Sequence, residues 1–240
     1  MISNSESSRW DLCRFLKTLA YFGAIPVLSG VDWVQQQLGS RVNPTVDGGQ
    51  RVRESACIFD FRQLGPGGEA EAQSALEGIW GAVDDVVMGG VSSSGISWVE
   101  GNALFAGVVS TANSGGFASV RTRNFEPALD LAAYTGLQLR VKGDGNRYKF
   151  LIRDQSQWDG VAYAYSFDTV ADTWLTVEVP FAEMVPVFRA RTMDAATHTL
   201  DQQQVRAFQL MLSKFEYDGQ LNPAFEPGPF RLYIESVCGY

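Results

Sequence analysis

The chain from Ile79 toward the C-terminus repeats one pattern, in which apolar and polar residues alternate over short runs. In the run 137–142, with the sequence Leu-Gln-Leu-Arg-Val-Lys, every second residue is apolar. Because neighbouring residues of a strand point to opposite faces of its sheet, this pattern predicts strands with one buried face. Further runs of the same character cover 104–108, 148–153, 163–167, 175–179, 208–213 and 230–235.

Turn-forming residues separate these runs, such as Gly-Asp-Gly-Asn at 143–146 and Tyr-Asp-Gly at 217–219. Helices do not alternate with the expected strands, so a doubly wound α/β fold is not predicted. Roughly eight strands at this spacing predict an all-β sandwich or jelly roll. The preceding residues predict a first strand at 57–61, a turn at 65–68 and a short helix or loop at 69–76.

The N-terminal segment has a helical periodicity instead. Apolar residues recur at helical spacing over 10–24 and again over 28–38. We expect a helical segment at 1–38, a linker at 39–56 and a β-sandwich domain at 57–240. Two interpretations stay open: the segment packs on the sandwich, or it docks on a membrane interface or a groove of a partner. The residues expected to carry docking are Trp10, Phe15, Leu19, Phe22 and Trp33.

Charge and cysteine content limit the classes of binding partner and the cellular compartment that we expect. The formal net charge of −8 repels phosphate backbones, so nucleic-acid binding is not expected, whereas a local contact with a membrane surface stays open. The first residues do not predict a secretory signal, and the apolar run 19–31 is short for a spanning helix. Cys13, Cys57 and Cys238 are widely spaced and odd in number. They predict a reducing compartment and cysteines that serve as small core residues, with a single disulfide as the alternative.

Catalytic and metal sites have little support in the sequence. His198 is the only histidine, so no Ser/His/Asp or Cys/His nucleophile system can be built and no zinc cluster is expected. Asp144, Asn146 and Asp159 could offer oxygens to Ca²⁺, but their spacing matches no EF-hand, and turn chemistry accounts for them. Chemistry by two carboxylates remains an alternative. We therefore expect a binding protein with no catalytic residues, no metal and no cofactor.

A candidate binding loop begins at Asp84 and Asp85 and continues through Met88, Gly89 and Gly90 into a run of serines. Glycines allow a positive φ or the close approach of another backbone, and serines can bond their own backbone. The loop either serves only the fold or presents a binding site, and the residues leave both interpretations open.

Arginines form a second candidate group: Arg121, Arg123, Arg153, Arg189 and Arg191. If they converge, they form an anion or carboxylate site, because guanidinium groups bind such ligands bidentately. Ordinary surface pairing with Asp and Glu is the alternative. Asp144 lies in a turn that could join the same face. Tyr165, together with Trp158, could stack on a sugar.

Several spaced motifs agree with one known family. They are Val-Asp-Asp-Val-Val-Met-Gly-Gly-Val-Ser-Ser-Ser at 83–94, Ser-Gly-Gly-Phe at 114–117, the strand and turn at 137–145, and the segments 148–153, 188–191 and 230–234. Together they resemble the complex I intermediate-associated protein 30 family over residues 57–237. The resemblance implies a galactose-binding-like jelly roll. It also implies an assembly-factor role, for respiratory complex I in mitochondria or for a photosystem in photosynthetic organisms, and it carries over no catalytic residue.

The N-terminal segment lacks the composition of a mitochondrial transit peptide, which favours a cyanobacterial or plastid relative. We expect a chaperone or assembly factor that binds protein subunits of an assembly intermediate. It would be peripherally associated with a membrane on the cytoplasmic or stromal side, with the mitochondrial matrix as the alternative. Its recognition face would comprise loops 84–94 and 143–147 with Arg121 and Arg153. A carbohydrate- or small-ligand-binding module is the competing function, and an enzyme or nucleotide-binding subunit is the third.

Overall fold

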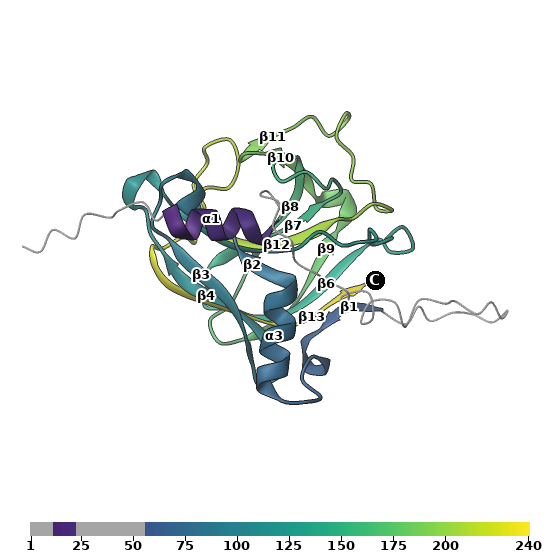
Figure 1. The fold of residues 1–240 in the computed structure, drawn as a ribbon. Coiled ribbons are helices and arrows are strands. Elements are labelled where there is room, and N and C mark those ends of the chain that lie inside the picture. The colour runs from purple at the N-terminus through teal and green to yellow at the C-terminus, as the bar shows by residue number, and fades with distance from the viewer. Residues whose placement is uncertain (1–11, 23–55) are drawn as a thin grey trace, which may run out of the picture.

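The computed structural model describes residues 12–22 and 56–240, whose strands form two antiparallel sheets stacked as a sandwich (Figure 1). One sheet has the order β3-β4-β13-β6-β9, and β1 also pairs with β13. Its strands are β1 (Cys57–Asp60), β3 (Ser93–Val99), β4 (Asn102–Val109), β6 (Gly136–Lys142), β9 (Trp174–Pro180) and β13 (Gly228–Gly239). The predicted all-β sandwich is therefore confirmed.

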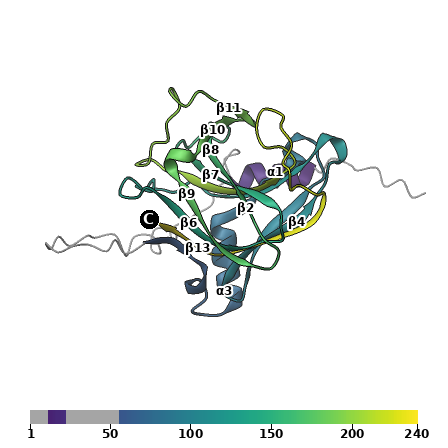
Figure 2. The ribbon, with the colours of Figure 1, turned by 180° about the vertical axis from the view of Figure 1, so that it is seen from behind.

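The second sheet has seven strands in the order β11-β10-β8-β7-β12-β5-β2. Its strands are β2 (Trp80–Ala82), β5 (Phe117–Thr122), β7 (Arg147–Arg153), β8 (Ala162–Asp168), β10 (Val185–Phe188), β11 (Arg191–Thr192) and β12 (Ala207–Ser213). Seen from behind, β7 and β8 of this sheet lie above β9, β6 and β13 of the other (Figure 2). The short strand β2 is the edge strand nearest to the N-terminal helix.

Each run of alternating residues became a strand, with differences at the boundaries. The expected first strand ends at Asp60, because the Asp60 side chain accepts from the Arg62 N–H and caps a 3-10 turn at Phe61–Gln63. The segment 69–76, expected as a short helix or loop, is a helix that continues to Ile79 as α3 (Glu69–Ile79). Strands β2, β3, β10 and β11 were not predicted. β2, β10 and β11 have two to four residues, too few to show an alternation, and β3 begins with two serines and a glycine.

The hydrophobic core fills the space between the two sheets. Its largest fully buried side chains include Tyr148, Phe61, Phe105, Phe150 and Phe208. Edge-to-face contacts join some of these rings, as between Phe105 and Tyr148, whose centroids lie 6.4 Å apart. Burying an aromatic or aliphatic side chain contributes about 1.5–3 kcal/mol, so this cluster is the main source of stability.

A disulfide joins Cys57 on β1 to Cys238 on β13, across a sequence separation of 181. This corrects the expectation that the cysteines are reduced core residues. The two residues are directly opposed partners of an antiparallel strand pair, a relationship that their spacing in the sequence cannot reveal. Cys13 is a free, exposed thiol.

The N-terminal helix α1 (Leu12–Tyr21) confirms the described part of the helix expected at 10–24. It lies across the layer that contains β2 and β12 (Figure 1). Trp10, Trp33, the helical repeat at 28–38 and the linker up to residue 55 fall outside the described residues. Among the helices that the structure describes, none is long and apolar enough to cross a membrane.

Candidate functional site

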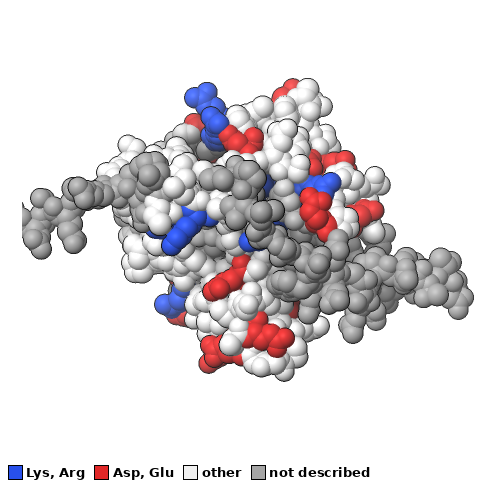
Figure 3. Space-filling model, in the orientation of Figure 1, with Lys and Arg blue, Asp and Glu red and all other residues white. Residues whose placement is uncertain are grey.

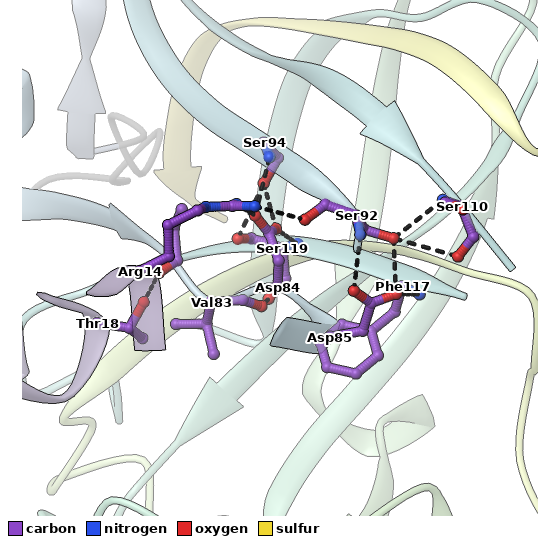
Figure 4. Close-up of polar contacts among 11 residues, drawn as sticks. Arg14, Thr18, Val83, Asp84, Asp85, Ser92, Ser94, Ser110, Phe117 and Ser119 are labelled. Carbon is purple, nitrogen blue, oxygen red and sulfur yellow. Dashed lines mark hydrogen bonds and ion pairs between the residues drawn. The ribbon is translucent and has the colours of Figure 1, made fainter. Parts of the chain in front are cut away.

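The first candidate loop folds around Asp84, which is 3% exposed (Figure 4). Its Oδ1 accepts from the Ser94 hydroxyl at 2.5 Å and the Ser119 N–H at 3.1 Å. Its Oδ2 accepts from the Ser94 N–H at 2.8 Å and from Nη2 of Arg14 at 3.0 Å. Burial raises the pKa of Asp84, while its bonds to Ser94 and Ser119 and the Arg14 charge oppose that shift. One carboxylate thus joins β3, β5 and α1.

Asp85 makes a second buried junction beside the first. Its Oδ1 accepts from the Ser92 N–H at 2.9 Å. Its Oδ2 accepts from the Ser92 hydroxyl at 2.6 Å, the Gly116 N–H at 2.7 Å and the Phe117 N–H at 3.3 Å. Charge-assisted bonds of this kind are stronger than neutral ones, so the carboxylate fixes the loop at 115–117 against the motif.

The glycines of the two motifs allow this packing. A Cβ on Gly90 would lie 2.3 Å from Cγ of Asp85, and a Cβ on Gly115 would lie 2.4 Å from its Oδ2. Gly89, at φ 91°, ends the 3-10 helix Asp85–Met88 in the left-handed conformation. These residues therefore have a role in the fold, and whether the loop also presents a binding site stays a prediction. Met88 and Ser93 are the exposed residues of the motif, and Met88 is its exposed apolar residue, with 76% of its surface exposed.

Helix α1 is held against this network and against the edge strand β2. Nη1 of Arg14 donates to the Ser92 carbonyl at 3.2 Å, and the Tyr21 hydroxyl donates to the Glu77 carbonyl at 2.7 Å. The Tyr21 ring packs on Gly81 of β2, where a Cβ would lie 2.5 Å from ring atom Cε1. Burial raises the pKa of Tyr21 to about 12. The helix thereby packs on the outer face of β2, and the Thr18 hydroxyl lies 3.5 Å from the Ala82 carbonyl of this edge strand.

Two of the predicted arginines meet on the outer surface of the seven-stranded sheet. Arg121 on β5 is the cross-strand partner of Gln209 on β12, and Arg153 on β7 is the partner of Ala207. Nη2 of Arg153 lies 3.5 Å from the Gln209 Oε1. Because β12 lies between β5 and β7, both guanidinium groups come to one area. We call Arg121, Arg123, Arg153, Gln209 and Trp158 the arginine face.

Neutral oxygens and rings surround the guanidinium groups of the arginine face. Nη1 of Arg121 donates to the Trp158 carbonyl at 3.0 Å, and Nη1 of Arg153 donates to the Gly160 carbonyl at 2.9 Å. The Arg121 guanidinium carbon lies 5.3 Å from the Trp158 ring and 5.7 Å from the Phe22 ring. The Arg123 guanidinium lies 4.0 Å from the Tyr21 ring. Cation–π contacts of this kind offset only part of the desolvation of a charge.

The charges of the arginine face have no ion-paired carboxylate among the described residues, although the charge of Asp159 acts on Arg153. Within residues 12–22 and 56–240, no carboxylate forms an ion pair with Arg121, Arg123 or Arg153. The Nε atom of each of the three is buried without a hydrogen-bond partner. Burial lowers the pKa of Arg121 to about 9, and the charge of Arg153 adds to the effect. Burial also lowers the pKa of Arg153, which the charge of Asp159 opposes.

The other predicted binding residues lie apart from this face. Arg189 is exposed and pairs with Asp159 at an Nε–Oδ2 distance of 2.9 Å, and Arg191 is exposed on β11. The five arginines therefore do not converge as a group. Asp144 accepts from the Tyr148 hydroxyl at 3.0 Å and the Arg231 N–H at 2.8 Å, as a turn residue does.

Side chains predicted for stacking or docking have mixed positions. Tyr165 packs against the core between the sheets, so it is not placed beside Trp158 for sugar stacking. Phe22 packs on Trp158, with ring centroids 5.1 Å apart. Phe15 and Leu19 are half-buried on α1, and whether they dock on a membrane or partner stays a prediction. No group of His, Cys, Asp and Glu within the described segments could hold a metal ion.

Lys149 is a buried charge that sequence reasoning missed, because its strand position resembled an exposed one. Its Nζ donates to the carbonyls of Phe215 and Glu216 at 2.5 and 2.7 Å. Burial lowers its pKa to about 8, while the Glu216 carboxylate opposes that shift. Lys149 therefore fastens the loop after β12 onto the outer surface of the seven-stranded sheet. Gln209 and Arg14 were also missed, since nothing in their local sequence marks them.

Basic residues do not form one continuous area in the space-filling view. Lys and Arg side chains are separated by Asp, Glu and uncharged residues over the visible, described part of this side (Figure 3). A phosphate backbone needs a row of basic contacts, and the visible side offers none among its described residues.

Comparisons with known proteins agree with the fold. A carbohydrate-binding module of family 11, from the cellulosomal cellulase Lic26A-Cel5E of Clostridium thermocellum, superposes with a TM-score of 0.52 and 17% identity, over 78% of this chain and 95% of that one. A family 11 module from Clostridium thermocellum in complex with a β-1,3-1,4-mixed-linked tetrasaccharide gives a TM-score of 0.51 and 16% identity, over 77% and 94%. At this identity the likeness shows a shared fold alone.

No curated protein matches the chain in a sequence comparison. The sequence profile of one family matches residues 68–234, from the start of α3 into β13, and so includes the Asp84–Asp85 network and the arginine face. The protein is therefore a member of the complex I intermediate-associated protein 30 family.

Proposed function

We propose that the protein is an assembly factor or chaperone that binds subunits of a membrane-bound respiratory or photosynthetic complex during its construction. The observation that carries the proposal is the family match over residues 68–234. Association with complex I intermediates is what the family is named for, and a related complex could take the same place in another membrane. The proposal extends that role to this chain.

A binding role, rather than catalysis, is supported by how the acidic motif is used. Asp84 and Asp85 are the paired carboxylates that acid–base chemistry would require. Each carboxylate is buried and accepts four hydrogen bonds. The donors to Asp84 lie on α1, β3 and β5, and the donors to Asp85 lie at Ser92 and at 116–117. A carboxylate committed in this way is poorly placed to exchange a proton with a substrate.

The test is a pull-down of the tagged, full-length protein from gently solubilised membranes, followed by quantitative mass spectrometry. We expect subunits of one membrane complex to be enriched, which would identify both the client and the compartment. Cytoplasmic or stromal association is proposed, and co-purification with mitochondrial complex I would instead place the protein in the matrix. A protein recovered without membrane subunits would contradict the assembly role.

A matched pair of variants makes the pull-down specific. Met88 and Val170 are both apolar and exposed, at 76% and 56%, but only Met88 belongs to the family motif. We expect Met88→Glu to reduce the enrichment of client subunits and Val170→Glu to leave it unchanged. Equal enrichment with both variants would mean that the motif's exposed tip does not face the client.

The competing proposal, a carbohydrate-binding module, follows from the likeness of the fold to the family 11 modules. The inward position of Tyr165 and the packing of Phe22 on Trp158 weigh against a sugar-stacking platform on the outer surface. Calorimetric titration with a β-1,3-1,4-linked tetrasaccharide decides the point. We expect no heat of binding, and saturable binding would replace the assembly role with a carbohydrate-binding one.

A further inference from the structure

We infer that the arginine face is a receptor for carboxylate groups of an acidic protein segment, and that the C-terminal end of α1 covers this receptor. The inference rests on the proposed function and deepens it by naming the chemistry that the client presents. It also gives a role to arginines that belong neither to the hydrophobic core nor to the ion pairs among the described residues.

The first argument is that no carboxylate of the described residues forms an ion pair with these arginines. Arg121, only 3% exposed, and Arg153 lie on the same outer surface with Gln209 between them. Among the described residues, the hydrogen bonds of both guanidinium groups go to neutral oxygens, and their Nε–H groups are buried without acceptors. Burying charges without an ion-pair partner is strongly unfavourable. Binding of an anion beside these arginines would therefore stabilise the protein.

The second argument selects a carboxylate among anions. The Nε–H of a guanidinium, together with an Nη–H, presents a planar fork that matches the two oxygens of a carboxylate. The carbonyls of Trp158 and Gly160 and the Oε1 of Gln209 also lie against these guanidinium groups. They would repel a doubly charged phosphate more than a singly charged carboxylate. The Trp158 ring offers an apolar wall for the rest of a peptide.

The third argument is the cover that α1 provides. Phe22 lies against Arg121 and Trp158, and Tyr21 lies against Arg123. A helix of 10 residues is not stable by itself in water, so α1 depends on its contacts with the sandwich. The hydroxyl of Tyr21 and the guanidinium of Arg14 are among the groups that hold it. Weakening its aromatic end exposes the arginines to an incoming segment.

The fourth argument concerns specificity. The chain has a net charge of −8, so an acidic peptide is repelled by the protein as a whole. Binding of such a peptide therefore reports a local site rather than general electrostatic attraction. Phosphate serves as the competing probe, because it shares the negative charge but lacks the planar pair of oxygens and the peptide backbone.

The test is calorimetric titration of the full-length protein with an oligoglutamate peptide at low ionic strength, repeated with inorganic phosphate. We expect oligoglutamate to bind and phosphate to bind much more weakly. Arg153→Gln should weaken peptide binding by about tenfold or more, because a charge-assisted bond is lost. Arg191→Gln, on an exposed arginine of the same sheet, should leave binding unchanged. Equal affinity of these two variants, or tighter binding of phosphate than of peptide, would overturn the inference.

Phe22→Ala is the variant whose effect a folding defect cannot imitate. Removing the ring uncovers Arg121, so we expect oligoglutamate to bind several-fold more tightly. Unchanged or weaker binding would show that α1 does not cover the site. The titrations and the membrane pull-down test different proposals. If the protein binds oligoglutamate but captures no membrane complex, the carboxylate receptor is supported and the assembly role is contradicted.

Discussion

Arg14 on α1 and Asp84 in the loop after β2 form an ion pair, with Nη2 and Oδ2 3.0 Å apart, although the two residues are 70 positions apart in the chain. The pair connects the N-terminal helix to the same carboxylate that joins β3 and β5. Asp84 of the acidic motif therefore connects strands of the two sheets and also anchors the helix that packs on the edge strand β2.

Arg14→Gln should loosen α1 without unfolding the sandwich. Asp84 keeps its three other donors, so we expect the free energy of unfolding to fall by only about 1 kcal/mol. Hydrogen exchange should accelerate within residues 12–22. Lys17→Gln, on the exposed side of the same helix, is the control, and equal exchange rates in the two variants would contradict the anchoring role.

Gly115→Ala should be strongly destabilising, because the new methyl group would lie 2.4 Å from Asp85 Oδ2 and 3.0 Å from the Ala112 carbonyl. Overpacking of this kind costs about 1–3 kcal/mol. The matched control is Gly95→Ala, where the methyl group would meet nothing within 4 Å. Urea denaturation should separate the two variants, and similar midpoints would mean that the 115–117 loop moves without cost.

Lys149 gives the stability a specific dependence on pH. Its pKa is about 8 in the folded protein and 10.5 in the unfolded chain, so between these values the unfolded chain holds a proton that the folded protein has lost. Stability contributed by Lys149 therefore rises with pH across this window, by ~3 kcal/mol at most, and is constant below it.

Lys149→Met should be less stable than the native protein, since the Phe215 and Glu216 carbonyls lose their donor. The difference in unfolding free energy should widen from pH 8 to 10.5. Lys17→Met, which changes an exposed lysine, should show no such widening. A difference that stays constant over the window would show that the Lys149 ammonium is not desolvated.

The disulfide between Cys57 and Cys238 should add measurable stability, because it restricts an unfolded loop closed across 181 positions. We expect reductant to lower the free energy of unfolding by ~2–5 kcal/mol. Cys57→Ser should reproduce the loss and become insensitive to reductant, whereas Cys13→Ser should behave as the native protein. Identical urea midpoints with and without reductant would contradict a structural role for the bond.

Part of the arginine face could be predicted from the sequence. Arg121 and Arg123 were expected on one face of a strand and Arg153 on another strand, with an anion site as the hypothesis if they converged. Arg121 and Arg153 come together because β12 lies between β5 and β7. This strand order cannot be read from the local sequence. Arg189 follows β10 at a positive φ of 49° and turns away to pair with Asp159.

The sequence by itself determined the longer alternating strands, the turns between them and the family, because alternation, glycine placement and spaced motifs are local properties of the chain. Only the tertiary structure decided which polar residues are buried. In the sequence, Asp85 looks like an ordinary loop residue, Lys149 like an exposed strand residue, and Cys57 and Cys238 like isolated cysteines. Their burial and the disulfide arise only when distant segments pack together. The physical reason is that burial and partners are set by strand order and by the packing of loops over the sheet, and both are relations between residues far apart in sequence.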